Sequence, residues 1–253
     1  RGAWFRATIL FILALIGTVG MWSVVVFIPD IEKEFGLDRG TSSLLYAFTM
    51  IGFGFGTVVI GKVYDKFGIK KPILLATFVL ITSYYFYSIF PFYWQFLILQ
   101  FFMGFAASAF FGPAMADISK FFNKQRGFAL SIVASANYVA GATWPLLIGY
   151  FLKFIDWRAA HFWISICLFI MIPLILLLKN ASVDESKSHD MKQRYKDIRL
   201  DLSNNQIQVL LMLAGICCCV AMAMPQVHMV ALCVDNGFGL QVGTEILAVM
   251  LYS

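Results

Sequence analysis

Seven long apolar runs, separated by shorter polar segments, set the pattern of the chain. Each run has roughly the 17–25 residues that an α-helix needs to cross the hydrocarbon core of a bilayer. An eighth run starts near Thr244 and continues to the end of the chain. The seven runs are Ala7–Pro29, Ser43–Val63, Ile73–Phe90, Trp94–Met115, Phe128–Leu152, Ala160–Leu178 and Gln206–Leu232. The pattern predicts an all-α fold, a polytopic bundle of transmembrane helices.

One long polar segment divides these runs unevenly. Residues 180–205 are rich in Lys, Asp and Ser and contain neither Pro nor Gly. We interpret this segment as a cytoplasmic linker, either a solvated tether or a partly helical strip on the membrane surface. The predicted domains are a six-helix transmembrane bundle over residues 1–179, the linker over residues 180–205, and the start of a second bundle over residues 206–253, which holds helix 7 and part of helix 8.

Composition favours a membrane protein. Of the 253 residues, 60% are hydrophobic and 13% are charged, whereas about a quarter of the residues of a soluble domain are charged. This apolar excess is too large for one soluble core of this size, so part of it must face lipid. The net charge of +5 does not indicate a nucleic-acid partner, because the placement of the charges matters more than their sum.

The basic residues predict how the chain is oriented. Cytoplasmic loops of membrane proteins carry an excess of Lys and Arg. The N-terminus and the segments that follow the second, fourth and sixth runs hold 15 of the 19 Lys and Arg residues. The opposite side holds the other four, which are Lys33, Arg39, Lys153 and Arg158. We therefore expect a multi-pass protein of the cell membrane with its N-terminus in the cytoplasm.

The residue types that carry catalysis or bind metals are scattered. The three His residues stand at positions 161, 189 and 228, and three of the five Cys residues are consecutive, at positions 217–219. Consecutive residues of a helix point in different directions, so these Cys lack the spacing of metal ligands. No carboxylate lies inside the seven runs. We expect no catalytic residue, no metal and no cofactor, and hence no enzyme.

Small residues recur at intervals of four along two of the runs. Gly52 and Gly56 form a G-x-x-x-G pair, and Gly104, Ser108 and Gly112 continue the same step. Lipid offers no hydrophobic drive between helices, so close packing of backbones holds membrane helices together. We predict that these positions lie at contacts between helices.

The segment between the second and third runs carries the most specific motif. Gly61–Pro72 reads GKVYDKFGIKKP. Asp65 places a negative charge at the end of a helix, where the N-terminus of a neighbouring helix would attract it. Gly68 permits a tight turn with positive φ. The stretch resembles the loop motif G-x-x-x-D-[RK]-x-G-[RK]-[RK] of the major facilitator superfamily, with Ile69 as an extra residue.

In that family the loop latches the two halves of a transporter together in one conformation and releases them in the other. The resemblance implies a six-helix N-terminal half of a major facilitator fold, followed by the beginning of the C-terminal half. It also implies that Asp117 pairs with Lys66 or a neighbouring base. The implied residues of the conformational latch are Gly61, Asp65, Lys66, Gly68, Lys70, Lys71 and Asp117.

Three further segments resemble the monocarboxylate and oxalate/formate branch of the superfamily. They are Pro29–Ser43, Phe121–Pro145 and Pro225–Gly239. In the second of them Lys124 and Arg126 match the basic cluster of the branch, while Gln125 departs from it. The resemblance implies alternating-access transport of a small organic anion such as a monocarboxylate, by symport or exchange. A carrier of a drug or a sugar, and a non-transporting sensor with the same fold, are the alternatives.

Polar side chains at membrane depth are the candidates for substrate binding, because each is costly if it faces lipid. In the superfamily, helices 1, 4 and 7 line the cavity and helix 5 contributes to it. The implied substrate contacts are Trp22, Tyr46, Asn137, Tyr138 and Gln226. Each of these can equally be a packing residue. His228 could carry a coupling proton, because the unperturbed pKa of His is about 6.5, or it could lie at the outer interface.

Overall fold

The computed structural model describes residues 2–122, 125–178 and 203–252, and every regular element in this part of the chain is helical. The chain divides into two compact units, residues 1–180 with residues 227–253, and residues 181–226. The predicted linker lies outside the described residues except for positions 203–205. Seven helices among the described residues are long and apolar enough to cross a membrane. The predicted all-α membrane fold is therefore confirmed.

The first apolar run forms two helices, α1 (Gly2–Gly17) and α2 (Val19–Phe35), instead of the one that was predicted. Thr18 separates them with φ −88° and ψ 4°, and its hydroxyl donates to the Ala14 carbonyl at 2.8 Å. Helix α2 continues past Pro29, where the apolar run ends, and closes at Gly36 with φ 62°. Hydropathy marks the edge of the apolar region, and the helix itself continues into the polar region.

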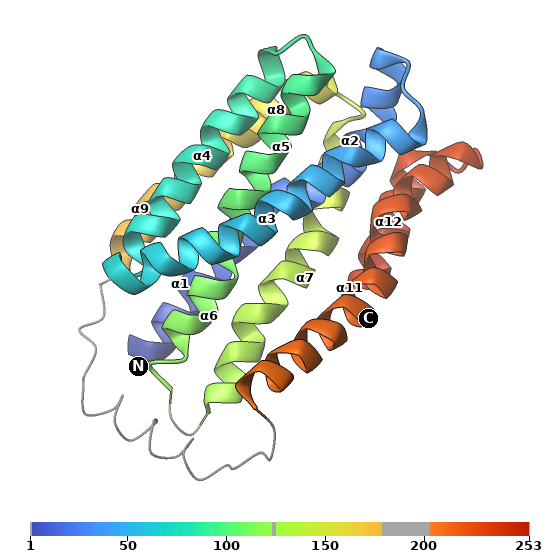
Figure 1. The fold of residues 1–253 in the computed structure, drawn as a ribbon. Helices are drawn as coiled ribbons and strands as arrows, with labels where there is room; N and C mark the ends of the chain where they lie inside the picture. Colours follow the sequence, from blue (N-terminus) through green and yellow to red (C-terminus); the bar gives the residue numbers. More distant parts are fainter. Residues whose placement is uncertain (1, 123–124, 179–202, 253) are drawn as a thin grey trace. The chain divides into compact units, whose positions relative to one another are not determined.

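The remaining helices follow the predicted order (Figure 1). In the first unit, 3₁₀ turns interrupt the fourth and sixth spans at Ser108–Phe110 and Leu168–Ile170. The helices of these spans are α3 (Arg39–Phe67), α4 (Lys70–Ile89), α5 (Tyr93–Ala107), α6 (Gly112–Ile118), α7 (Arg126–Phe151), α8 (Trp157–Cys167) and α9 (Met171–Leu177). Helix α11 (Asn204–Asp235) belongs to both units, and α12 (Gly239–Tyr252) follows it.

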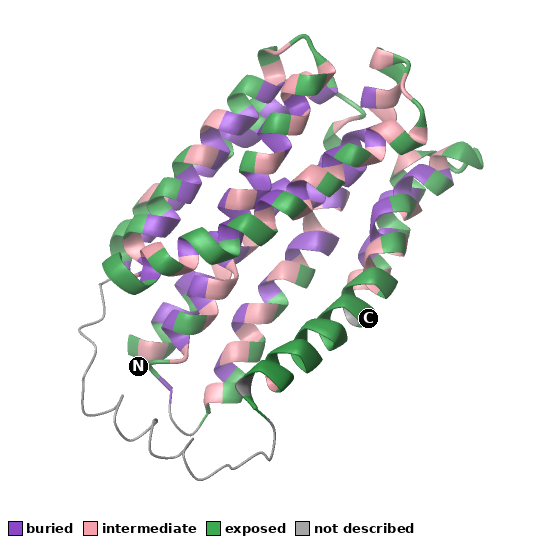
Figure 2. Ribbon diagram, viewed as in Figure 1, coloured by how far each residue is buried: buried purple, intermediate pink, exposed green. Residues whose placement is uncertain are grey.

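Helix α2 is the most enclosed element of the first unit. It contacts α3, α5 and α7, and the consecutive residues Ser23–Ile28 are all buried. A helix that is apolar all round belongs in an interior, and the stretch Val19–Ile28 of α2 fits this rule. The other helices of this unit carry a buried side and an exposed, mostly apolar side (Figure 2). In a bilayer the exposed side would face lipid.

Glycines set the closest helix–helix contact, between α3 and α5. A Cβ at Gly52 would lie 2.0 Å from the Phe101 carbonyl oxygen, and a Cβ at Gly104 would lie 1.8 Å from the Thr49 carbonyl oxygen. Gly56 packs in the same way on Phe105. These positions confirm the predicted contacts. Gly112 does not, because no atom lies within 4 Å of the place where its Cβ would stand.

Asp38 fixes the start of α3. Its carboxylate accepts hydrogen bonds from the Thr41 hydroxyl at 2.6 Å and from the Gly40 and Thr41 amides at 3.0 and 3.2 Å. The side chain is the N-cap of the helix, where Asp is among the preferred residues. The hydrogen bonds from Thr41, followed by the one from Gly40, hold the pKa of Asp38 below its ordinary value.

Replacing Asp38 with alanine is expected to loosen the first turn of α3. Near neutral pH the Gly40 and Thr41 amides should exchange hydrogen faster in Asp38→Ala than in the unchanged protein. The pKa is lower in the folded state, so the cap acts fully above about pH 4 and is lost as pH falls through the lowered pKa. Hydrogen exchange followed by mass spectrometry would test this, and equal exchange near neutral pH would contradict it.

Candidate functional site

Two helix breaks meet in the interior of the first unit. One is at Thr18 between α1 and α2, and the other is at Ser108–Phe111 between α5 and α6. The ring of Phe110 packs directly on Gly17, where a Cβ would lie 2.4 Å from the ring. From α7, the Trp144 indole donates to the Leu15 carbonyl at 2.8 Å, just before the first break. The two breaks therefore pack against each other. Trp22 lies about one turn along α2 from the break at Thr18.

Trp22 and Asn137, two of the predicted substrate contacts, are brought together. The Trp22 indole donates to Oδ1 of Asn137 on α7 at 3.2 Å. One turn further along α7, Gly141 makes room for the indole, because a Cβ there would lie 2.6 Å from the Trp22 ring and 2.9 Å from Leu251 of α12. Helices α2, α7 and α12 thus converge on a buried indole with an amide beside it.

The other predicted contacts are more dispersed. Tyr46 lies half-buried on α3, and Tyr138 is exposed on α7 next to Asn137. Gln226 follows Pro225 inside α11. His228, the candidate for a coupling proton, is exposed on the same helix. Whether these four residues bind substrate or protons stays a prediction.

A buried polar network in the first unit joins side chains that are far apart in sequence. The Thr49 hydroxyl donates to Gln100 at 2.9 Å, and the Gln100 amide donates to the Tyr87 hydroxyl at 3.4 Å. Separately, the hydroxyl groups of Ser23 and Tyr84 lie 2.7 Å apart. All of these side chains are buried. The network links α3, α4 and α5 and satisfies polar groups that would be costly in a dry interior.

His161 on α8 belongs to the same interior. Its ring stacks on Tyr87 with 4.4 Å between centroids and an interplanar angle of 4°, and Phe27 lies 4.1 Å away. Its Nδ1 lies 2.8 Å from the Trp157 carbonyl one turn earlier. In the described part of the chain, no group of three or more His, Cys, Asp or Glu residues could hold a metal ion.

The motif loop lies at the end of α3. Gly68 ends the helix with φ 73°, which confirms the positive φ predicted for this residue. Helix α4 begins two residues later, at Lys70. Asp65 is exposed, and among the described residues no hydrogen bond or ion pair engages it. Lys66 and Lys71 lie over the Phe67 ring. Lys70 donates to the Leu176 carbonyl at 3.4 Å.

Asp117 pairs with Arg6 and not with Lys66, so the predicted partner was wrong. Arg6 Nε lies 2.6 Å from Asp117 Oδ2, and both side chains are buried. The Arg6 guanidinium also covers the Phe121 ring at 4.5 Å. The physical reason is that α6 contacts α1, which carries Arg6, while Lys66 is placed over the ring of its own neighbour Phe67.

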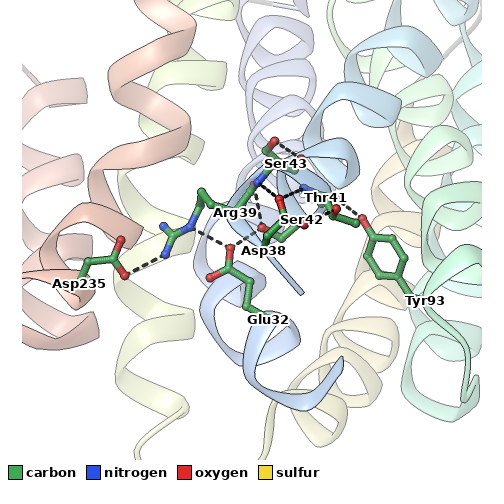
Figure 3. A network of polar contacts seen from close by, with 9 residues as sticks. Glu32, Asp38, Arg39, Thr41, Ser42, Ser43, Tyr93 and Asp235 are labelled. Atoms are coloured by element: carbon green, nitrogen blue, oxygen red, sulfur yellow. Dashed lines mark hydrogen bonds and ion pairs between the residues drawn. The ribbon is translucent and has the colours of Figure 1, made fainter. Parts of the chain in front are cut away.

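A second charged network lies at the other end of α3 (Figure 3). Arg39 Nε is 2.8 Å from a carboxylate oxygen of Glu32 at the end of α2, and its NH2 donates to Asp235 at the end of α11, at 2.9 Å. The Ser42 hydroxyl also donates to Glu32. The Tyr93 hydroxyl, at the start of α5, donates to the Thr41 carbonyl. The sequence shows that these charged residues stand at the ends of apolar runs, but it does not show which of them form pairs.

Arg158 forms a separate cluster at the start of α8. Its guanidinium donates to Glu34 at 2.6 Å and to the Phe90 carbonyl at 2.7 Å. The Trp157 indole donates to the other oxygen of Glu34 at 2.8 Å. This cluster joins α2, α8 and the end of α4, all of which belong to the first six spans.

Comparison with known proteins places these features in a family. The Major Facilitator Superfamily matches the chain over residues 10–253. The MFS-type transporter pynF of Aspergillus niger is 28% identical over 151 residues, which are 58% of this chain and 34% of that protein. The uncharacterized MFS-type transporter YdgK of Bacillus subtilis is 25% identical over 184 residues, which are 68% of this chain and 44% of that protein.

Solved structures show the same fold. A crystal structure of a D-xylose-proton symporter superposes with a TM-score of 0.74 at 11% identity, over 98% of this chain and 66% of that one. The inward-open structure of the xylose transporter XylE from E. coli gives a TM-score of 0.62 at 12% identity, over 98% of this chain and 64% of that one. The matched part spans about a third of the length of the first fungal relatives. The match over almost the whole chain shows that the protein belongs to the Major Facilitator Superfamily.

Proposed function

We propose that the full-length protein is a secondary transporter that works by alternating access and carries a small organic anion such as a monocarboxylate, by symport or exchange. The observation that carries this proposal is the Trp22–Asn137 pair at the meeting point of α2, α7 and α12. Trp22 is buried and Asn137 is half-buried, and polar groups inside a membrane bundle often mark a functional site. The pair lies about one turn along α2 from the break at Thr18.

The direction of the hydrogen bond favours an anion. Oδ1 of Asn137 accepts from the Trp22 indole, which turns the two N–H donors of the amide away from the indole. Among the described residues no hydrogen bond uses these donors. Donors of this kind suit a carboxylate oxygen. The sequence places no carboxylate inside the seven long apolar runs, so no negative charge from these segments would repel an anion at this depth.

The proposal also assigns each part of the chain to one half of the transporter or to the linker between them. Residues 1–179 form the N-terminal half, residues 180–205 link it to the C-terminal half, and residues 206–253 begin that half. The motif loop of Gly61–Pro72 is the latch on the cytoplasmic side. Exposed Asp65 and open Gly61 are available there for a helix of the C-terminal half. The 15-to-4 distribution of basic residues supports a cytoplasmic N-terminus in the cell membrane, and a proton is the candidate coupling ion.

A second candidate is export of a larger organic compound. Two fungal relatives are named agnestins efflux protein AgnL12, from Paecilomyces divaricatus, and fujikurins efflux protein, from Gibberella fujikuroi. They are 26% and 32% identical to this chain over 35% and 21% of their own lengths. The aromatic surfaces of Trp22 and Tyr138 would suit such a substrate as well as a small anion.

Uptake by the full-length protein in liposomes tests both candidates. We expect saturable uptake of radiolabelled lactate, pyruvate, formate or oxalate. In Trp22→Phe, which keeps an aromatic ring but removes the indole N–H, KM should rise about fivefold. The reason is that one hydrogen bond contributes about 1 kcal/mol, and this bond orients the Asn137 amide toward the substrate.

The matched control is Trp94→Phe, because Trp94 is exposed near the start of α5. Its KM should equal that of the unchanged protein. Flux of a sugar, an amine or a larger organic compound without flux of any carboxylate would overturn the anion assignment. The absence of flux for every class would favour a non-transporting sensor.

A further inference from the structure

Two arginines at the same end of the first unit differ in what they join. Arg158 contacts α2, α8 and the end of α4, all within the first six spans. Arg39 contacts Glu32 of α2 and also Asp235 at the end of α11 (Figure 3), the first helix beyond the linker. Of these two residues, only Arg39 spans the proposed division between the halves of the transporter.

The network is anchored firmly on one side. Asp38 caps α3 directly before Arg39, Ser42 donates to Glu32, and Tyr93 of α5 donates to the Thr41 carbonyl. Glu32 is largely covered, with a side-chain exposure of 14%. These contacts hold Glu32 and the first turn of α3 in place, so Arg39 has Glu32 within 2.8 Å whether or not Asp235 is present.

The other side of the network is loosely held. Asp235 has a side-chain exposure of 57%. It is the last residue of α11, directly before the loop that leads to α12. Exposed ion pairs contribute little and break readily. An interaction that must form and separate once in each transport cycle needs this property, whereas the covered Arg39–Glu32 pair is suited to remain.

The position of Arg39 along α3 indicates at which face of the membrane the Arg39–Asp235 pair lies. Arg39 begins α3, and the proposed latch loop follows the end of the same 29-residue helix. At 1.5 Å per residue the two sites lie about 40 Å apart, at opposite faces of a membrane. Contacts that close one face should therefore form when the contacts that close the other face are open.

We propose that Arg39 and Asp235 form an ion-pair gate that closes the face opposite the Gly61–Pro72 loop. The proposal rests on the alternating-access function proposed above. In the closed state Arg39 holds both Glu32 and Asp235. In the open state it keeps Glu32 and releases Asp235, which moves away with the C-terminal half. Arg39 never loses a carboxylate partner, so the opening does not leave a charge uncompensated.

Distance measurements between spin labels test the gate in the full-length protein. Labels at Phe92→Cys, in the loop before α5, and Phe238→Cys, in the loop after α11, would report the separation of the two halves at this face. Both residues are exposed, and the five native Cys would be replaced first. In Asp235→Asn the population with the longer distance should rise about two- to fivefold relative to the shorter, as expected for loss of an exposed ion pair.

Two variants make the result specific. Glu245→Gln removes the same charge from α12, where Glu245 accepts only from Gln241 of its own helix among the described residues, and should leave the distances unchanged. Asp235→Glu keeps the carboxylate and should keep the short distance dominant.

Identical distributions in the unchanged protein and in Asp235→Asn would overturn the gate, whether or not the protein transports a solute. The same shift in Glu245→Gln as in Asp235→Asn would also overturn it, because net charge would then explain the effect. A shift confined to Asp235→Asn in a protein that moves no solute would support the gate and overturn the transport proposal instead.

Discussion

Replacing Gly104 with alanine is expected to destabilise the bundle by about 3 kcal/mol, the upper end of the range for overpacking a core. The added Cβ would lie 1.8 Å from the Thr49 carbonyl oxygen, far inside van der Waals contact. The obstacle is the backbone of α3, which cannot rotate away as a side chain can. Helices α3 and α5 would have to separate, and the hydrogen bond between Thr49 and Gln100 would stretch with them.

Thermal unfolding of the purified full-length protein in detergent would measure the effect. A loss of 3 kcal/mol corresponds to a Tm lowered by about 10 °C in a protein of 150–250 residues, and by less in a larger one. Gly52→Ala should behave similarly, because its Cβ would lie 2.0 Å from the Phe101 carbonyl oxygen. The matched control is Gly54→Ala, on the same helix, where no atom lies within 4 Å. Equal Tm values for Gly104→Ala and Gly54→Ala would show that the two helices do not pack as described.

The number of spans and the glycine contacts were predictable because they depend on local properties. A helix in lipid must satisfy its own backbone hydrogen bonds, so the length of an apolar run determines a span. The four-residue step of Gly52 and Gly56 places both on one face of a helix. That face then selects a partner with equally small or recessed positions. In the structure, this partner is the face of α5 that carries Gly104.

The helix break at Thr18 was harder to predict from the sequence. No proline stands near it, and the apolar run passes through it unchanged. Part of its cause is tertiary, because Phe110 packs directly on Gly17. The bond from the Thr18 hydroxyl to the Ala14 carbonyl is the local part. The flanking Gly17 and Gly20 were the only sequence signal. Sites formed by two distant segments leave even weaker traces, and they account for most of what was missed.

His161 shows which signal was overlooked. The three His residues were read as scattered because they are far apart in sequence. Along α8, however, Trp157, Ala160, His161 and Ile164 are all buried, with the three- and four-residue spacing of one helix face. A His on the apolar face of a transmembrane helix needs a polar or aromatic surrounding. Tyr87 and Phe27 supply the aromatic part here.

Of the predicted substrate contacts, Trp22 and Asn137 share a hydrogen bond. Gln226 and His228 lie on α11, which the proposed division assigns to the C-terminal half. Their proposed roles depend on residues far apart in sequence that face them in the fold, and hydropathy carries no information about such partners.

The second large effect is expected at the buried ion pair of Arg6 and Asp117. Asp117→Leu would remove the carboxylate 2.6 Å from the Arg6 guanidinium and leave a buried positive charge without it. Breaking a buried pair in this way costs about 3–5 kcal/mol. The Tm of the full-length protein should fall by roughly 10 °C or more, or the variant should fail to accumulate as a monodisperse species.

The double variant Arg6→Met/Asp117→Leu tests whether the loss of stability comes from the broken ion pair or from any substitution at this site. Apolar residues of similar volume often replace a buried pair at little cost, because the desolvation of two charges offsets most of their attraction. Methionine can also keep a favourable contact with the Phe121 ring, which the Arg6 guanidinium now covers. The double variant should therefore be more stable than Asp117→Leu alone, and Glu245→Gln, an exposed change of the same charge, should have no effect on Tm. A double variant as unstable as the single one would mean that Arg6 stabilises α1 through contacts other than its pair with Asp117.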